Sequence, residues 1–66
     1  MEKRYITVNG KRRAVWFSMW STGELWLIFA GEEHGHRAHR DGYAYTHGGT
    51  LYRAAVDRAV ELGLMG

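Results

Sequence analysis

The sequence predicts a small α+β domain, in which an antiparallel β-meander of three to four strands is followed by one C-terminal α-helix packed on one sheet face. Three observations lead to this fold class. Two turn signals separate three strand-like runs, every glycine lies between or after the apolar segments, and the last third of the chain repeats apolar residues at helical spacing. With 66 residues, the chain has room for a single domain over residues 1–66.

The first two strands are predicted over residues 3–8 and 12–20. Between them stands Asn9-Gly10, the type of dipeptide that most strongly favours a two-residue type I′ hairpin turn, since both positions require a positive φ angle. Such a turn pairs Val8 with Lys11. The register of the whole hairpin follows from this pair.

The third strand is predicted over residues 24–30. The segment Ser21-Thr22-Gly23 before it fits a three-residue loop in which the glycine takes the left-handed conformation. This loop pairs Trp20 with Glu24. The second hairpin therefore has a defined register as well.

The two turns together sort the side chains of the three strands into two faces. One face, called here the inner face, collects Ile6, Val8, Val15, Phe17, Met19, Leu25, Leu27 and Phe29. The other, called here the outer face, collects Tyr5, Thr7, Ala14, Trp16, Ser18, Trp20, Trp26 and Ile28, with Lys3 and Arg12 beside them. A slip of one residue would mix the faces. Both faces are apolar, so each needs a cover.

A helix is predicted over residues 51–62, after a weaker candidate for a fourth strand at residues 43–46. Thr50 is a candidate N-cap, and Gly63 is a candidate C-terminal stop. The apolar stripe of the helix contains Leu51, Tyr52, Ala55, Val56, Ala59, Val60 and Leu62. A helix of this length, about 18 Å, covers one face of the sheet but not both, and we expect it on the inner face.

Composition argues against several functional classes. The formal charge of +2 is too small to predict nucleic-acid binding by itself. The chain has no cysteine, no signal-like start and no apolar run of transmembrane length, so we expect a cytoplasmic, intracellular protein that does not enter a membrane. It contains no G-x-S-x-G motif and no complete phosphate-binding glycine loop, and we therefore expect neither enzymatic activity nor a cofactor.

The histidines raise the question of a metal site. His34, His36 and His39 lie close together in the sequence near several carboxylates, and His47 follows. Imidazole and carboxylate suit zinc or nickel, but a structural zinc site needs four ligands at defined geometry, and no spacing here specifies them. We interpret the segment as a solvated loop and predict no metal site.

The start of the predicted helix carries a family resemblance. Its residues are Thr46-His47-Gly48-Gly49-Thr50-Leu51, continuing through Ala54, Ala55, Ala59 and Leu62. This pattern resembles the strand-to-helix junction of HicB-type antitoxins, in which a final strand leads through T-x-G-x-T-L into an Ala-rich helix. The resemblance implies a β-β-β-α domain that binds and neutralises a toxin.

The outer face is the predicted functional surface, because Trp, Tyr and Arg dominate the energetics of protein interfaces. The predicted partner-binding residues are Tyr5, Arg12, Arg13, Trp16, Trp20, Trp26, Arg37 and Arg40. Three explanations of this face stay open: a cover by residues 31–42 or by a second copy in a homodimer, a docking surface for a protein, and a platform on which bases of a nucleic acid stack.

Size and the lack of catalytic motifs make the chain similar in type to small phage-encoded inhibitors, including anti-CRISPR proteins, which act by occupying a surface. We therefore expect a non-enzymatic protein that binds a host protein or a nucleoprotein complex. A small nucleic-acid-binding regulator and a HicB-like antitoxin are the alternatives.

Overall fold

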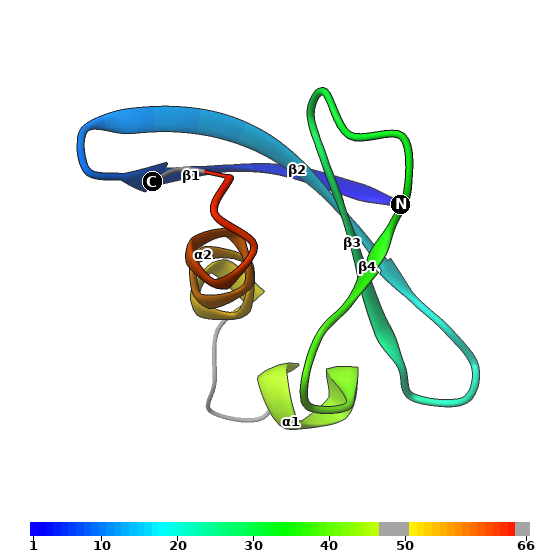
Figure 1. Ribbon diagram of the computed structural model, residues 1–66. Coiled ribbons are helices and arrows are strands. Elements are labelled where there is room, and N and C mark those ends of the chain that lie inside the picture. The colour runs from blue at the N-terminus through cyan, green and yellow to red at the C-terminus, as the bar shows by residue number, and fades with distance from the viewer. Residues whose placement is uncertain (47–50, 65–66) are drawn as a thin grey trace.

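A computed structural model describes residues 1–46 and 51–64, which form one sheet and two helices. The sheet contains β1 (Glu2–Val8), β2 (Lys11–Met19), β3 (Leu25–Phe29) and β4 (His36–Arg37), arranged in the order β1-β2-β3-β4. Every neighbouring pair is antiparallel, so the sheet is a meander. The helices are α1 (Gly42–Thr46) and α2 (Leu51–Glu61). The predicted α+β fold is confirmed (Figure 1).

Both predicted hairpin turns are confirmed. Asn9 and Gly10 have φ angles of 52° and 77°, as a type I′ turn requires, and Val8 pairs with Lys11. In the second hairpin, the amide of Trp20 donates to the carbonyl of Glu24 (2.9 Å), and Gly23 has a φ of 90°. The two faces are consequently built from the residues that turn chemistry assigns to them.

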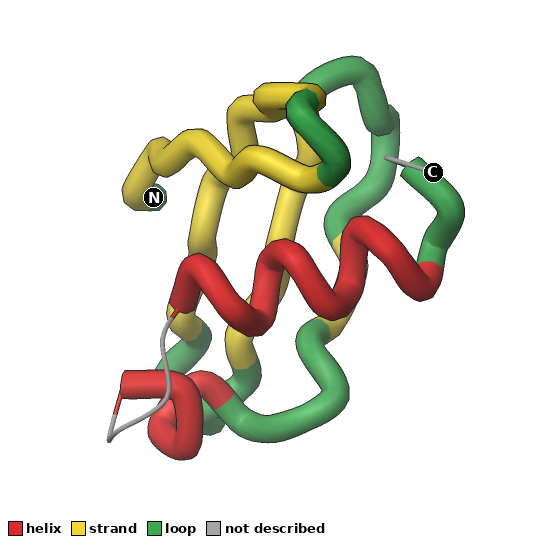
Figure 2. The backbone as a smooth tube through the Cα atoms, turned by 90° about the vertical axis from the view of Figure 1, so that its left-hand side faces the viewer, coloured by secondary structure: helices red, strands yellow, loops and turns green. Residues whose placement is uncertain are grey.

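Helix α2 lies on the inner face and crosses the strands (Figure 2). It ends one residue earlier than predicted. Gly63, with a φ of 74°, closes the helix: its amide donates to Val60 (3.1 Å), and the amide of Leu64 donates to Ala59 (3.0 Å). This pair of bonds is a Schellman motif, which confirms Gly63 as the stop. The predicted N-cap, Thr50, lies outside the described residues.

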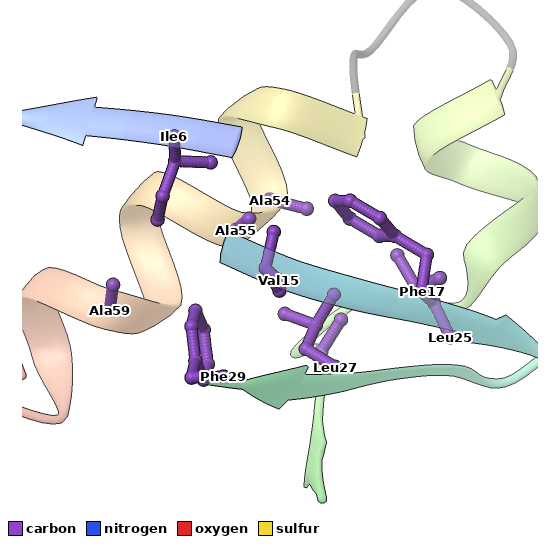
Figure 3. Close-up of a cluster of buried hydrophobic side chains, with 10 residues drawn as sticks. Ile6, Val15, Phe17, Leu25, Leu27, Phe29, Ala54, Ala55 and Ala59 are labelled. Carbon is purple, nitrogen blue, oxygen red and sulfur yellow. The ribbon is translucent and has the colours of Figure 1, made fainter. Parts of the chain in front are cut away.

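The core lies between the inner face and α2, and the sheet supplies all of its large side chains (Figure 3). These buried side chains are Ile6, Val15, Phe17, Leu25, Leu27 and Phe29, and small ones come from Ala38, Ala54, Ala55 and Ala59. The fully buried residues of α2 are thus all alanines, and Leu51, Val56 and Leu62 pack against the core while only partly buried.

The predicted apolar stripe of α2 is wrong in part. Val60 is 56% exposed and Tyr52 is 43% exposed, whereas Ala54, which the stripe omits, is buried. A face of alanines allows the helix to approach the sheet closely, and this shifts the buried face toward its smaller residues. On the sheet, Met19 of the predicted inner face is the last residue of β2 and is 47% exposed.

The fourth strand predicted at residues 43–46 is also wrong, because these residues belong to α1. Asp41 caps this helix by accepting a bond from the amide of Ala44 through its side chain (3.0 Å). A Cβ on Gly42 would lie 2.0 Å from the sulfur of Met19, so glycine lets α1 pack at the β2–β3 end of the sheet. The final strand that the HicB resemblance implies is not found here. The actual fourth strand, β4, lies within the His-rich segment.

Candidate binding surface

The outer face carries no helix, and its aromatic side chains are only partly covered. Tyr5 is 47% exposed and Trp20 is 46% exposed, while Trp16 and Trp26 are half-buried. In Figure 1 both helices lie on the other side of the sheet. Among the described residues, the outer face is therefore a solvent-facing surface. Its side chains are shielded from water mainly by packing against one another.

The first group on this surface combines two cations with two rings. The guanidinium carbon of Arg12 lies 4.1 Å from the ring centroid of Tyr5. The ammonium of Lys3 lies 5.2 Å from the ring of Tyr5 and 5.3 Å from that of Trp16. Cation–π contacts at such distances contribute about 0.5–1 kcal/mol each at exposed sites. They hold both cations against the sheet.

The register explains how this group forms. Lys3 lies directly opposite Trp16 on the neighbouring strand, and Tyr5 lies opposite Ala14. Because alanine leaves space beside the Tyr5 ring, Arg12 reaches that ring on the diagonal, at the distance typical of diagonal neighbours in a sheet.

The second group is a pair of stacked indoles. The rings of Trp20 and Trp26 have centroids 4.9 Å apart and an interplanar angle of 13°. Here too the residue directly opposite an aromatic ring is small, because Trp26 pairs with Ser18. Trp20, two residues after Ser18, is the diagonal neighbour of Trp26 and stacks on its ring. Offset or stacked aromatic pairs add about 0.5–1.5 kcal/mol beyond burial.

Strand β4 and its preceding loop border the second group. Arg37 pairs with Trp26 in the sheet register and so lies on the outer face, where it forms an ion pair with Glu24 (3.2 Å). The Cα of Gly35 faces the side chains of Trp26 and Ile28, to which an added Cβ would lie within 3.5 Å. Of the three explanations of the outer face, a cover by residues 31–42 thus applies in part, since Gly35 lies against Trp26 and Ile28.

Two of the predicted partner-binding residues lie elsewhere. Arg13 is on the inner face, because it alternates with Arg12 along β2. Its guanidinium donates to the carbonyl of Ala30 (3.0 and 2.6 Å) and to the carbonyl of Leu64 (3.0 Å). Arg13 therefore ties the C-terminal segment to the sheet. Arg40 is exposed in the bend between β4 and α1, outside the sheet.

Two residues that the predicted set omits, Lys3 and Glu24, belong to this surface. The signal for both was present in the hairpin registers, which place Lys3 opposite Trp16 and Glu24 beside Trp20 on the outer face. The indole nitrogen of Trp26 is also notable, since it is buried without a hydrogen-bond partner among the described residues.

The histidines are dispersed rather than clustered. His36 is on the inner side next to Phe29, with ring centroids 6.0 Å apart, and His34 is exposed in a loop. Across the described parts of the chain, no three His, Asp or Glu side chains are grouped so as to hold a metal ion. His47 lies outside those parts.

His39 instead joins the β4–α1 segment to α2 through Glu61, and Arg58 lies 3.2 Å from the same imidazole nitrogen. The hydrogen bond from His39 is the largest cause that lowers the pKa of Glu61 below its ordinary value of 4.5. Desolvation opposes this shift, and the nearby Arg58 supports it.

Comparisons of the chain with known protein families, with characterised proteins and with solved structures find no significant match. No helix within residues 1–46 and 51–64 is long and apolar enough to cross a membrane.

Proposed function

We propose that the protein is a non-enzymatic interaction protein, of the kind represented by small phage inhibitors such as anti-CRISPR proteins, and that it binds a protein through its outer face. The observation that carries the proposal is the exposure of Tyr5 and Trp20, nearly half of each residue, on a sheet face that neither α1 nor α2 covers. Exposed aromatic residues next to Arg are the side chains that most often dominate binding energy at protein interfaces.

The partner surface that fits best is apolar at its centre and acidic at its rim. The centre of the outer face consists of the Trp20–Trp26 pair and the rings of Tyr5 and Trp16. Its charged groups are Lys3, Arg12 and Arg37 against Glu24, which leaves an excess of positive charge. Complementary charges at the rim of an interface favour orientation and fast association.

Protein is preferred to nucleic acid because the ring faces are partly occupied. Trp20 and Trp26 stack on each other, and Arg12 lies over Tyr5. Bases need free ring faces on which to stack, whereas protein side chains also pack against ring edges. A nucleoprotein complex would fit if its protein component supplies the contact.

We place the interaction inside the cell. Small domains that work outside cells commonly depend on disulfides, and this chain has no cysteine.

A site-specific cross-linking experiment tests the proposal. A photoreactive benzoylphenylalanine replaces Thr7 on the outer face or, as the matched control, Val60 on the exposed side of α2. Each protein is irradiated in extract of its natural host, cross-linked proteins are identified by mass spectrometry, and affinity is then measured with the purified partner. We expect a partner captured from Thr7 only, with Trp20→Ala weakening affinity by about tenfold or more and Val60→Ala leaving it unchanged.

Equal capture from both positions, or full affinity of Trp20→Ala, would contradict the proposal. The second candidate, a nucleic-acid-binding regulator, is favoured by Lys3 and Arg12 beside exposed rings. It predicts binding to an oligothymidine of about 20 nucleotides that weakens steeply between about 50 and 200 mM salt. A protein interface anchored by Trp20 predicts little change over that range.

A further inference from the structure

Strand β1 is an edge strand, and most of its outward backbone groups have no partner among the described residues. The two-residue turn makes Val8 and Lys11 a hydrogen-bonded pair, so alternate residues of β1 point their amides and carbonyls toward β2. The remaining ones, Lys3, Tyr5 and Thr7, point theirs away from the sheet. No described residue pairs with the outward groups of Lys3 or Tyr5.

Tyr52 marks where this open edge ends. The hydroxyl of Tyr52 on α2 accepts a bond from the amide of Thr7 and donates to its carbonyl, both at 3.2 Å. The outward groups of Thr7 are thus already satisfied by the protein itself. The open part of the edge is limited to the N-terminal half of β1, where residues 2–5 are all exposed.

Charge and register disfavour a second copy of the chain at this edge. A symmetric antiparallel pair centred on Arg4 would place two Arg4 side chains opposite each other, about 4.5 Å apart at Cα. One centred on Lys3 would oppose two lysines. One centred on Tyr5 would need the outward groups of Thr7, which Tyr52 occupies. Cationic edge residues commonly act against self-pairing.

We infer that the open half of β1 accepts an extended acidic segment of a partner protein as a fifth, antiparallel strand, bonded to the outward amides and carbonyls of Lys3 and Tyr5. Arg4 forms an ion pair with Glu2 (3.0 Å), so residues 2–5 keep an excess of one positive charge, carried by Lys3. A carboxylate opposite Lys3 would match this charge, and an apolar residue beside Tyr5 would continue the outer face. The inference rests on the proposed function, because it assumes a protein partner. It specifies the part of that partner that binds, an extended segment held by hydrogen bonds to the backbone of β1.

A proline substitution distinguishes the contribution of the backbone amide to peptide binding from that of the side chain at this edge. Lys3→Pro removes the outward amide without removing any bond to β2, and edge strands tolerate proline at such positions. Lys3→Ala is the matched control, since it removes the same side chain and keeps the amide. Circular dichroism and thermal melting establish that both variants fold.

Random nine-residue peptides displayed on phage are selected against the full-length protein, and the strongest binder is synthesised as the probe. We expect acidic peptides whose affinity is about tenfold or more lower for Lys3→Pro than for Lys3→Ala. In hydrogen exchange, the amides of Lys3 and Tyr5 should exchange rapidly in the free protein and be protected when the peptide binds.

Equal affinities of the two variants, or a bound peptide that leaves these two amides unprotected, would overturn strand addition, as would selection without any binder sensitive to Lys3→Pro. A dimer in sedimentation that Lys3→Pro dissociates would make the occupant a second copy and overturn the acidic segment. If Trp20→Ala loses the cross-linked partner while Lys3→Pro retains it, the proposed function stands and strand addition alone fails.

Discussion

The two faces of the sheet are made of alternate residues of the same strands, but their apolar side chains are covered in different ways. On the inner face, Leu27 and its neighbours are excluded from water by α2. On the outer face, Trp26 is covered by the indole of Trp20 and by the loop residue Gly35. The residue types follow this difference: aliphatic and phenyl groups fill the enclosed side, and amphipathic rings with cations form the open side.

The difference shows what an apolar pattern does and does not reveal. Strands that are apolar on both sides predict two covers, but the pattern does not state whether the second cover is the chain itself. Residue chemistry gives better guidance, since Trp and Tyr tolerate partial exposure at an interface.

Phe29→Ala should cause the largest loss. Phe29 is fully buried at the centre of the inner face, so its removal leaves a cavity and should lower the free energy of unfolding by about 3–5 kcal/mol. Urea denaturation followed by circular dichroism measures this. Trp20→Ala is the counterpart on the outer face and should cost about 1 kcal/mol or less. Equal losses would show that both faces are core.

Arg13→Met should cost about 2 kcal/mol, because the carbonyls of Ala30 and Leu64 lose a charged donor. Hydrogen exchange should show faster exchange at Leu64, whose segment is no longer tied to β2. The adjacent Arg12→Met is the matched control. It removes only the contact with the exposed Tyr5 ring and should cost less than about 1 kcal/mol.

Trp26→Phe should leave stability unchanged or raise it by up to about 1 kcal/mol. The substitution keeps an aromatic ring opposite Ser18 and removes a buried N–H that has no partner among the described residues. Thermal melting and urea denaturation measure the change. A clear loss of stability would indicate that the indole N–H is bonded in solution.

The smallest effect is expected at acidic pH. The pKa of Glu61 is lowered chiefly by the hydrogen bond from His39, so the stabilisation is present above pH 4.5 and is lost as the pH falls through the lowered pKa. Glu61→Gln should therefore flatten the decline in melting temperature below that pH. Glu33→Gln, an exposed carboxylate in a loop, should leave the decline as it is.

The hairpins could be predicted from sequence because each turn has its own chemistry. Asn9-Gly10 and Gly23 require positive φ angles, and the strand register, the inner face and most of the outer face follow from them. Strand β4 could not be predicted, since two residues show no periodicity and pair only because the loop returns along β3. At residues 43–46, the tyrosines favour a strand by propensity, but the side chain of Asp41 caps the segment and stabilises a helix instead.

The candidate site was predicted less completely for a similar reason. Alternation along β2 places Arg13 on the inner face, whereas the prediction assigned Arg12 and Arg13 to the same partner-binding surface. The contact of Arg13 with Leu64 joins residues far apart in the sequence, and no local pattern encodes such a contact. The structural role of Arg13 can therefore be recognised only once the position of the C-terminal segment is known.

Helix α2 is positioned along the sheet by its packing and by two contacts near its ends. Its buried residues Ala54, Ala55 and Ala59 are small, and the larger Leu51, Val56 and Leu62 pack against the core while only partly buried. Two hydrogen-bonded contacts near the ends of the helix add to this packing and oppose rotation and sliding, namely Tyr52 bonded to Thr7 and Arg13 bonded to Leu64. Those two attachments therefore help to align the helix with the strands, so loss of either should leave the helix less firmly positioned on the sheet.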